Sequence, residues 1–192
     1  MKKIVLLSLC FFLLYLSLPV CASDVTPVEW YKNDKDPDIP KTLYVGRTLD
    51  CGNYTFSIVT QPVLGRYTNM LISDNDLEYL MIRVELKNNT DKTLGWLSSD
   101  SFKLVDVYRG RMYNSYPLDI TASAAAAQGA RQQVYIEEIG PDESMFTTLV
   151  FSVYPDVDGW IMYFSPHTYY EEDPVDEVSF LLPKVNHYEV EY

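Results

Sequence analysis

The chain has few side chains of the kinds that build catalytic centres. Its only two histidines, His167 and His187, do not stand at ligand spacing from another histidine or cysteine, so a zinc site is not indicated. The sequence has no Gly-x-Ser-x-Gly turn, no glycine-rich phosphate loop and no His-Glu-x-x-His pair. A Ser-His-Asp triad needs its members to meet only in space, so the sequence neither supports nor excludes one. We therefore expect a protein that is not an enzyme and that holds no cofactor.

An acidic segment near the N-terminal end has the start of a calcium loop. Asp34, Asp36 and Asp38 occupy alternate positions, as the first ligands of such a loop do. However, Ile39 and Val45 stand where the turn glycine and the closing bidentate glutamate are needed. A solvated acidic linker explains this segment better than a metal site does.

The densest negative charge lies near the C-terminal end of the chain. It comprises Glu171, Glu172, Asp173, Asp176 and Glu177. Such a charge run usually forms a solvated loop, although several carboxylates in one loop are also what calcium prefers. Pro174 and the missing turn glycine argue against a standard calcium loop, so we assign no metal site. The sequence leaves open whether this loop binds calcium.

Tyrosine is the residue type that best suits a recognition surface here. The chain has 16 tyrosines, many of which fit β-strands on propensity alone. At protein interfaces, tyrosine also supplies a large contact area at a low cost in conformational entropy. Tyr108, Tyr113 and Tyr116 fall on one expected hairpin. We therefore predict that these three side chains form a patch that binds a protein partner.

The first residues have the form of an export signal. Lys2 and Lys3 precede an apolar run, and small residues follow that run. The small residues predict cleavage after Ala22, which would make residues 1–22 a signal peptide. A cut before Cys21 stays open, because "LPVC" resembles the bacterial lipoprotein box, in which the cysteine carries lipid. Cys21 is thus the candidate lipidation site, and such a lipid would be the chain's link to a membrane.

The remainder of the chain is acidic and suits one domain. Cleavage after Ala22 removes two lysines and no acid, so the net charge changes from −12 to −14. This charge argues against a basic nucleic-acid-binding surface and against attraction to anionic membranes. Residues 23–41 contain three prolines and no sustained period, which predicts an extended linker before a domain at 42–192. Cys51 then has no disulfide partner within the chain, so the domain is not a disulfide scaffold.

Apolar and polar residues alternate along most of the domain, which indicates β-strands. In the clearest run, 79–87, the apolar residues share one face, as in an antiparallel sheet with one dry and one wet face. Apolar residues on both faces of 145–153 predict a central strand. Other expected strands lie at 42–52, 53–63, 101–108, 112–118, 159–166 and 175–183. The predicted core comprises Phe56, Ile58, Leu80, Ile82, Val84, Leu86, Phe102, Leu104, Leu149 and Phe151.

Seven or eight short strands predict an all-β fold. Their close spacing indicates a sandwich of two antiparallel sheets, with a closed barrel as the alternative. The stretch 119–133 is the exception, because four consecutive alanines favour a helix. It has no apolar stripe that would dock it, so we expect a helical turn or a loop on the surface.

Two stretches carry a resemblance to a known family. They read "EYLMIRVELKNNTDKTLGWLSSDSFKLVD" and "IGPDESMFTTLVFSV". Together they resemble a bacterial exported family of immunoglobulin-like domains of unknown function, whose members often follow a signal or lipoprotein peptide. The matching features are the Lys-Asn-Asn turn at 87–89, the strand at 102–106, the turn at 140–143 and the apolar strand at 149–151. The resemblance implies an immunoglobulin-like β-sandwich, similar in fold to the mycobacterial immunoprotective extracellular protein, and it brings no catalytic residues.

These observations predict an exported, non-catalytic β-sandwich that acts as a binding or protein-interaction module at the cell envelope. An accessory structural or chaperone-like subunit of an envelope assembly is the alternative, and an open sheet edge would favour it. A secreted hydrolase is a third interpretation, which a deep pocket holding His167 beside carboxylates would favour. The sequence does not indicate the identity of the partner or the oligomeric state.

Overall fold

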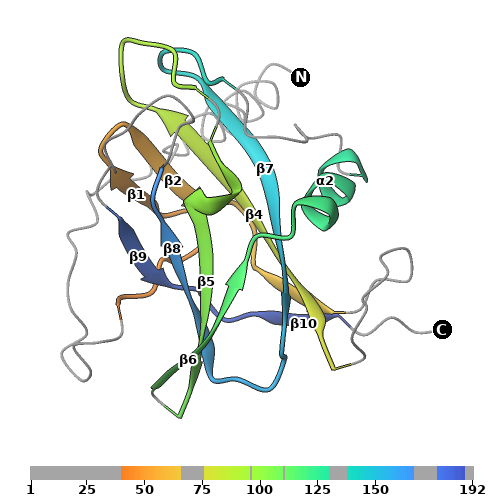
Figure 1. The fold of residues 1–192 in the computed structure, drawn as a ribbon. Helices are drawn as coiled ribbons and strands as arrows, with labels where there is room; N and C mark the ends of the chain where they lie inside the picture. Colours follow the sequence, from red (N-terminus) through yellow and green to blue (C-terminus); the bar gives the residue numbers. More distant parts are fainter. Residues whose placement is uncertain are drawn as a thin grey trace, which may run out of the picture.

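The described strands form two sheets that pack face to face as a β-sandwich (Figure 1). The structure, a computed structural model, describes residues 40–65, 76–95, 97–109, 111–129, 138–166 and 177–188. The predicted sandwich is thereby confirmed. The predicted signal peptide, and all but the last two residues of the predicted linker, lie outside the described residues.

The first sheet is built around β4 (Glu78–Asn88), an 11-residue strand. On one side, β7 (Ser144–Val153) pairs with β4 along almost its whole length. On the other side, β2 (Tyr54–Ile58) pairs with one half of β4, and β3 (Val63–Gly65) pairs with the other half. The run with the clearest alternation in the sequence is therefore the strand that organises this sheet.

Two short strands complete the first sheet. β1 (Thr48–Cys51) pairs with β2, and β10 (Asn186–Tyr188) pairs with β3. The β3–β10 pair is parallel, which differs from the predicted antiparallel arrangement. The described part of the chain has ten strands rather than seven or eight. The strands missed from the sequence, β3 and β10, have three residues each, which is too short for alternation to show.

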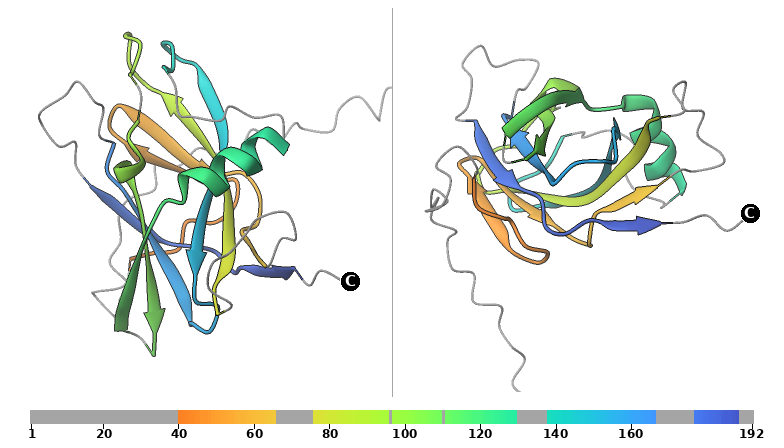
Figure 2. Two further views of the ribbon diagram at one scale, coloured as in Figure 1. Left: turned by 45° about the vertical axis from the view of Figure 1, so that its right-hand side comes forward. Right: turned by 90° about the horizontal axis from the view of Figure 1, so that it is seen from below.

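The second sheet has the strand order β6-β5-β8-β9. β5 (Phe102–Tyr108) follows a short 3₁₀ turn at Ser99–Ser101 and pairs with both β6 (Arg111–Pro117) and β8 (Gly159–Phe164). β9 (Val178–Leu181) pairs with β8 and lies at the far side of this sheet. Figure 2 shows the second sheet lying over the first and the β9–β10 connection crossing from one to the other.

The core between the sheets agrees with the prediction. All ten residues predicted for the core are at most 2% exposed. Aromatic rings from both sheets meet there: the ring centroids of Phe56 and Phe164 lie 5.4 Å apart, and those of Phe102 and Phe164 lie 5.2 Å apart. Phe180 approaches Phe56 at 5.1 Å. These contacts join β2 of the first sheet to β5, β8 and β9 of the second, so they hold the two layers together.

The alanine-rich segment forms a docked helix, so the expectation of a helical turn or loop without a docking face was wrong. Helix α2 (Ile120–Gly129) lies against the outer face of the first sheet (Figure 2). Ala122 packs against Tyr79 and Val150, and Ala126 covers the same small cluster. Small side chains allow the helix backbone to approach the sheet closely, and this is why no large apolar residue was needed.

Helix α2 also explains why both faces of β7 are apolar. The prediction that this strand lies centrally was wrong, because β7 pairs with β4 alone among the described strands. On its free edge, the backbone N–H of Val150 donates to Ser123 Oγ at 2.9 Å, and its carbonyl accepts from the Asp119 N–H at 2.9 Å. The helix thus covers the outer side chains and the edge of β7 together. The face of β4 expected to be wet is covered at Tyr79, which is 4% exposed.

Candidate functional site

The β5–β6 hairpin presents a group of exposed apolar and basic side chains. Tyr108 pairs with Arg111, so two residues connect the strands, and Arg109 has a positive φ of 51° in that connection. Tyr108, Met112 and Tyr113 are 38%, 51% and 76% exposed. Together with Arg109 and Arg111, these three side chains form what we call the hairpin patch.

Contacts within the hairpin patch hold its side chains in place. The ring centroids of Tyr108 and Tyr113 lie 6.4 Å apart, within the range of an aromatic pair. The guanidinium carbon of Arg109 lies 5.0 Å from the centre of the Tyr108 ring, which is a cation–π contact. Met112 Sδ accepts a hydrogen bond from the hydroxyl of Tyr163 on β8 at 3.3 Å. Contacts within the patch therefore position Tyr108, Tyr113 and Arg109, and a contact with β8 positions Met112.

A buried carboxylate fixes β6 against β5. Asp106 is fully buried, and its Oδ1 accepts a hydrogen bond from the Asn114 N–H at 2.7 Å. Its Oδ2 accepts from Asn114 Nδ2 at 2.9 Å and from the Tyr116 hydroxyl at 2.7 Å. The register of the two strands shifts between Val105 and Val107, which is a β-bulge in which Tyr113 and Asn114 of β6 lie opposite Asp106 alone. Three hydrogen bonds satisfy a charge that would be costly to bury alone.

The structure brings together only two of the three tyrosines predicted to form the binding patch. Tyr108 and Tyr113 lie side by side on the surface, whereas Tyr116 is 7% exposed and belongs to the core. The bulge adds a residue to β6 at 113–114, so the alternation of faces along this strand is interrupted between Tyr113 and Tyr116. The hairpin also lies at an edge of its sheet and is not central. Sequence reasoning missed Met112, which shares the exposed surface.

A cavity of about 470 Å³ lies at the same end of the sandwich as the hairpin turn. Figure 1 shows the β5–β6 turn and the β7–β8 connection together at the bottom of the molecule. Asp158, in that connection, accepts a hydrogen bond from the Arg109 N–H and donates its own N–H to the Val107 carbonyl. Asp158 also lines the cavity, so one residue joins the cavity wall to the hairpin turn.

The cavity wall has both polar and apolar surface, and its polar groups other than Asp158 come from the two chain segments that frame it. Its apolar side chains are those of Val157, Trp160, Leu181, Leu182 and Val185, together with Pro155 and Pro183. Its remaining polar residues are Thr42, Tyr44, Lys184 and His187. Trp160 is 4% exposed, and its indole nitrogen is buried without a hydrogen-bond partner.

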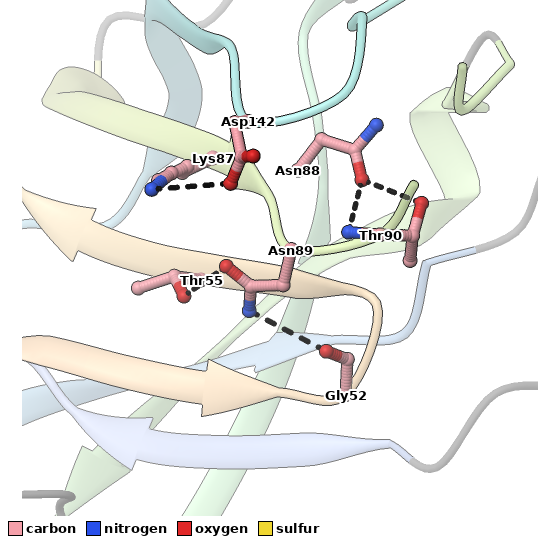
Figure 3. Close-up of polar contacts among 7 residues, drawn as sticks. All are labelled: Gly52, Thr55, Lys87, Asn88, Asn89, Thr90 and Asp142. Atoms are coloured by element: carbon pink, nitrogen blue, oxygen red, sulfur yellow. Dashed lines mark hydrogen bonds and ion pairs between the residues drawn. The ribbon is translucent and has the colours of Figure 1, made fainter. Parts of the chain in front are cut away.

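The opposite end of the sandwich is held by a polar turn. Asn88 is fully buried, and its amide nitrogen donates to the carbonyls of Lys92 and Ile139. Figure 3 shows its amide oxygen accepting from the backbone N–H and the hydroxyl of Thr90. Asn89 Oδ1 accepts from the Thr55 hydroxyl at 2.9 Å. The two asparagines of the Lys-Asn-Asn turn, which is part of the family resemblance, thus hydrogen-bond to other segments of the same chain and connect them. The turn therefore has a structural role.

Cys51 is a buried free thiol among the described residues. Burial raises its pKa to about 12, with a smaller contribution from the negative charge of Asp50. The protonated thiol is a weak nucleophile, so Cys51 has a packing role.

Several predicted features lie outside the described residues. They are Cys21, His167 and the acidic segment up to Asp176. Within the described ranges, no three His, Cys, Asp or Glu side chains are close enough to share a metal ion. No helix in the same ranges is long and apolar enough to cross a membrane.

Several solved structures are similar to this chain at low sequence identity. A candidate lipoprotein of Bacillus subtilis is 19% identical, with a TM-score of 0.43 over 67% of this chain and 35% of its own. The chain therefore spans about a third of that protein's length. An uncharacterized β-sandwich protein of Clostridium difficile is 15% identical, with a TM-score of 0.42 over 81% of this chain and 99% of its own.

A third structure, a functionally unknown protein of Listeria monocytogenes, is 13% identical, with a TM-score of 0.45 over 84% of this chain and 88% of its own. No curated protein matches the chain. The likeness to the mycobacterial immunoprotective extracellular protein stays a prediction. A family model described as a domain of unknown function, DUF4352, matches residues 43–175, which is most of the folded domain. The chain belongs to this family.

Proposed function

We propose that this protein is an exported binding module that captures a protein partner at the cell envelope through its hairpin patch. The observation that carries the proposal is the exposed pair of rings of Tyr108 and Tyr113, with exposed Met112 and two arginines in the segment between them. Tyrosine, methionine and arginine are enriched in protein interfaces, and tyrosine and arginine dominate binding hot spots. The patch suits a partner that offers an apolar surface with acidic groups at its rim.

The rigidity of the hairpin supports this role. Asp106 locks β6 onto β5 with three hydrogen bonds, and Asp158 holds the turn from the other side. A surface that is already ordered loses little conformational entropy when a partner binds. The sandwich therefore acts as the scaffold, and the hairpin acts as the recognition element.

The accessory-subunit alternative needs a sheet edge that accepts a partner strand. β6 is an edge among the described strands, which is the feature that this alternative requires. However, the bulge at Asp106 and the missing N–H of Pro117 both disturb the regular ladder that a partner strand would need. We therefore favour recognition by side chains over the addition of a strand.

The hydrolase alternative needs a nucleophile in a pocket. The cavity holds His187 and the carboxylate of Asp158, but neither a serine nor a cysteine is among its lining residues. One carboxylate oxygen of Asp158 is bonded to a backbone N–H rather than to a histidine. This geometry gives less support to hydrolysis than the exposed hairpin gives to binding.

The proposal is tested by removing the two exposed rings. The double variant Tyr108→Ser/Tyr113→Ser should bind the envelope fraction of its host at least about tenfold more weakly than the original chain. The control variant Phe146→Ser/Ile120→Ser removes two side chains of similar exposure from the other sheet and its helix, and it should bind normally. Circular dichroism and urea unfolding should show that both variants fold. Equal binding by the two variants would overturn the proposal.

Export is tested separately by the intact mass of the protein recovered from its host. We expect a chain that begins at Ser23, as the small residues before the cut predict. A mass with diacylglycerol on Cys21 would identify a lipid-anchored form of the same module. An uncleaved chain would contradict the export part of the proposal.

A further inference from the structure

We propose that the cavity beside the hairpin binds a carboxylate that carries an apolar body the size of a leucine or phenylalanine side chain. The site is distinct from the hairpin patch, although Asp158 touches both. The ligand chemistry has two sources, a free organic acid and the C-terminal residue of a peptide. Both offer the same pair of features, which are an anionic oxygen and an apolar group next to it.

The size and the wall of the cavity suit such a ligand. A volume of about 470 Å³ falls within the usual range for small-molecule sites, which runs from roughly 300 to 1,000 Å³. Val157, Trp160, Leu181, Leu182 and Val185 provide apolar surface in its wall. An apolar ligand group placed against them leaves water, which favours binding in proportion to the apolar area that becomes buried.

Trp160 supplies the second argument. Its indole N–H is a hydrogen-bond donor only, and it is buried with no partner. An unsatisfied buried donor destabilises a fold, so such groups in native proteins call for an explanation. The nitrogen has almost no accessible surface, so a ligand oxygen reaches this N–H only when the groups around the Trp160 ring shift on binding. The new hydrogen bond then recovers that free energy. The unpartnered indole N–H of Trp160 is therefore the reason to expect a hydrogen-bond acceptor in the ligand.

The positions of Lys184 and Asp158 in the cavity wall favour a ligand whose acceptor group is anionic. Lys184 and His187 lie in the β9–β10 segment that frames one wall, and the ammonium group of Lys184 is exposed. The single carboxylate of the wall, Asp158, lies on the hairpin side, where the Arg109 N–H donates to it. We therefore place the ligand's carboxylate toward Lys184 and His187 and its apolar body against the aliphatic wall.

The test follows the indole N–H resonance of Trp160 by two-dimensional ¹H–¹⁵N NMR of the chain with residues 1–22 removed. The resonance is assigned by its loss in Trp160→Phe. The probes are 3-phenylpropionate, its neutral amide, and a tripeptide ending in leucine with either a free or an amidated C-terminus. We expect 3-phenylpropionate or the free tripeptide to shift the resonance saturably. Each neutral form should bind at least about tenfold more weakly, because it lacks the charge-assisted bond.

Two variants report on the charge selection. Lys184→Ala should weaken binding of the acid at least about tenfold, whereas Lys103→Ala, an exposed lysine on β5, should leave it unchanged. Tighter binding of the free tripeptide than of 3-phenylpropionate assigns the site to peptide C-termini, and the reverse order assigns it to free organic acids. No shift of the Trp160 resonance with any probe would overturn the proposal. Equal binding by Lys184→Ala and Lys103→Ala would also overturn it.

The hairpin variant separates this inference from the proposed function. Tyr108→Ser/Tyr113→Ser should bind the acid as the original chain does, because neither ring lines the cavity. Loss of acid binding in that variant would contradict the independence of the two sites.

Discussion

The hydroxyl of Tyr116 donates a 2.7 Å hydrogen bond to the fully buried carboxylate of Asp106 on the neighbouring strand. This contact faces the core, whereas Tyr113, three residues earlier, faces solvent. One short strand thus provides both the interior bond that fixes the hairpin and the exposed ring that we assign to binding. Mutation of Tyr116 should therefore affect stability, and mutation of Tyr113 should affect binding.

Tyr116→Phe removes this hydrogen bond and keeps the ring. A hydrogen bond to a charged group contributes about 1.5–3 kcal/mol, so we expect the free energy of unfolding to fall by that amount. Urea denaturation monitored by circular dichroism measures the loss. The matched variant Tyr113→Phe changes an exposed ring and should stay within about 0.5 kcal/mol of the original chain. Equal stabilities for the two variants would show that the Asp106 contact is not formed.

Stability should also fall at alkaline pH. Burial, together with the hydrogen bond to Asp106, raises the pKa of Tyr116 to about 12, whereas an unfolded tyrosine titrates near 10. The folded state therefore keeps a proton that the unfolded state releases, so the free energy of unfolding decreases between about pH 10 and pH 12. Urea titrations across this window should show a shallower decrease for Tyr116→Phe. An unchanged slope in that variant would contradict this origin of the pH dependence.

The turn at Asn88 should tolerate little change. Asn88→Asp keeps the size of the side chain but replaces the amide nitrogen, which donates to the carbonyls of Lys92 and Ile139. The new oxygen cannot donate, so we expect a loss of about 2–4 kcal/mol from two unmatched carbonyls and a buried charge. Asn89→Ala is the control at the next position and should cost less than about 1 kcal/mol. Thermal unfolding of the two variants checks the difference.

Docking of helix α2 depends on one hydroxyl. Ser123→Ala leaves the buried N–H of Val150 without its acceptor, so we expect a loss of about 1–3 kcal/mol and faster exchange of that amide hydrogen. The control variant Ala125→Ser adds a hydroxyl at an exposed position of the same helix and should have little effect. Hydrogen exchange followed by NMR distinguishes local release of the helix from global unfolding. Unchanged protection of Val150 in Ser123→Ala would contradict the docking geometry.

The sequence was sufficient to predict the residues of the core between the sheets, but it was not sufficient to predict that helix α2 covers the outer face of the first sheet. Alternation placed Leu80, Ile82 and Phe56 correctly, because a strand between two layers must bury every second residue. It could not show that α2 docks through Ala122 and Ala126, since alanine carries no strong apolar signal. The same gap made β7 look central, although a helix rather than a strand lies beside it.

At the candidate site, too, the sequence predicted some features, and others became clear only from the fold. The sequence identified the tyrosine-rich hairpin, but it did not show that Tyr116 is buried while Tyr113 is exposed. The bulge at Asp106 depends on a register shift that no local pattern reveals. The cavity at Trp160 is formed by segments near residues 42, 158 and 184, which only the folded topology brings together.

Site-specific photo-crosslinking tests the central claim most directly. A photoreactive p-benzoylphenylalanine placed at position 113 lies in the hairpin patch, where the native ring is 76% exposed. The same residue at position 146 lies on the other sheet, where the native ring is also exposed, at 42%. We expect irradiation of the host's envelope to give a discrete protein adduct from position 113 and none of that mass from position 146. The adduct should disappear when Tyr108→Ser is added. The same adducts from both positions, or none from position 113, would contradict the assignment of the hairpin patch as the binding surface.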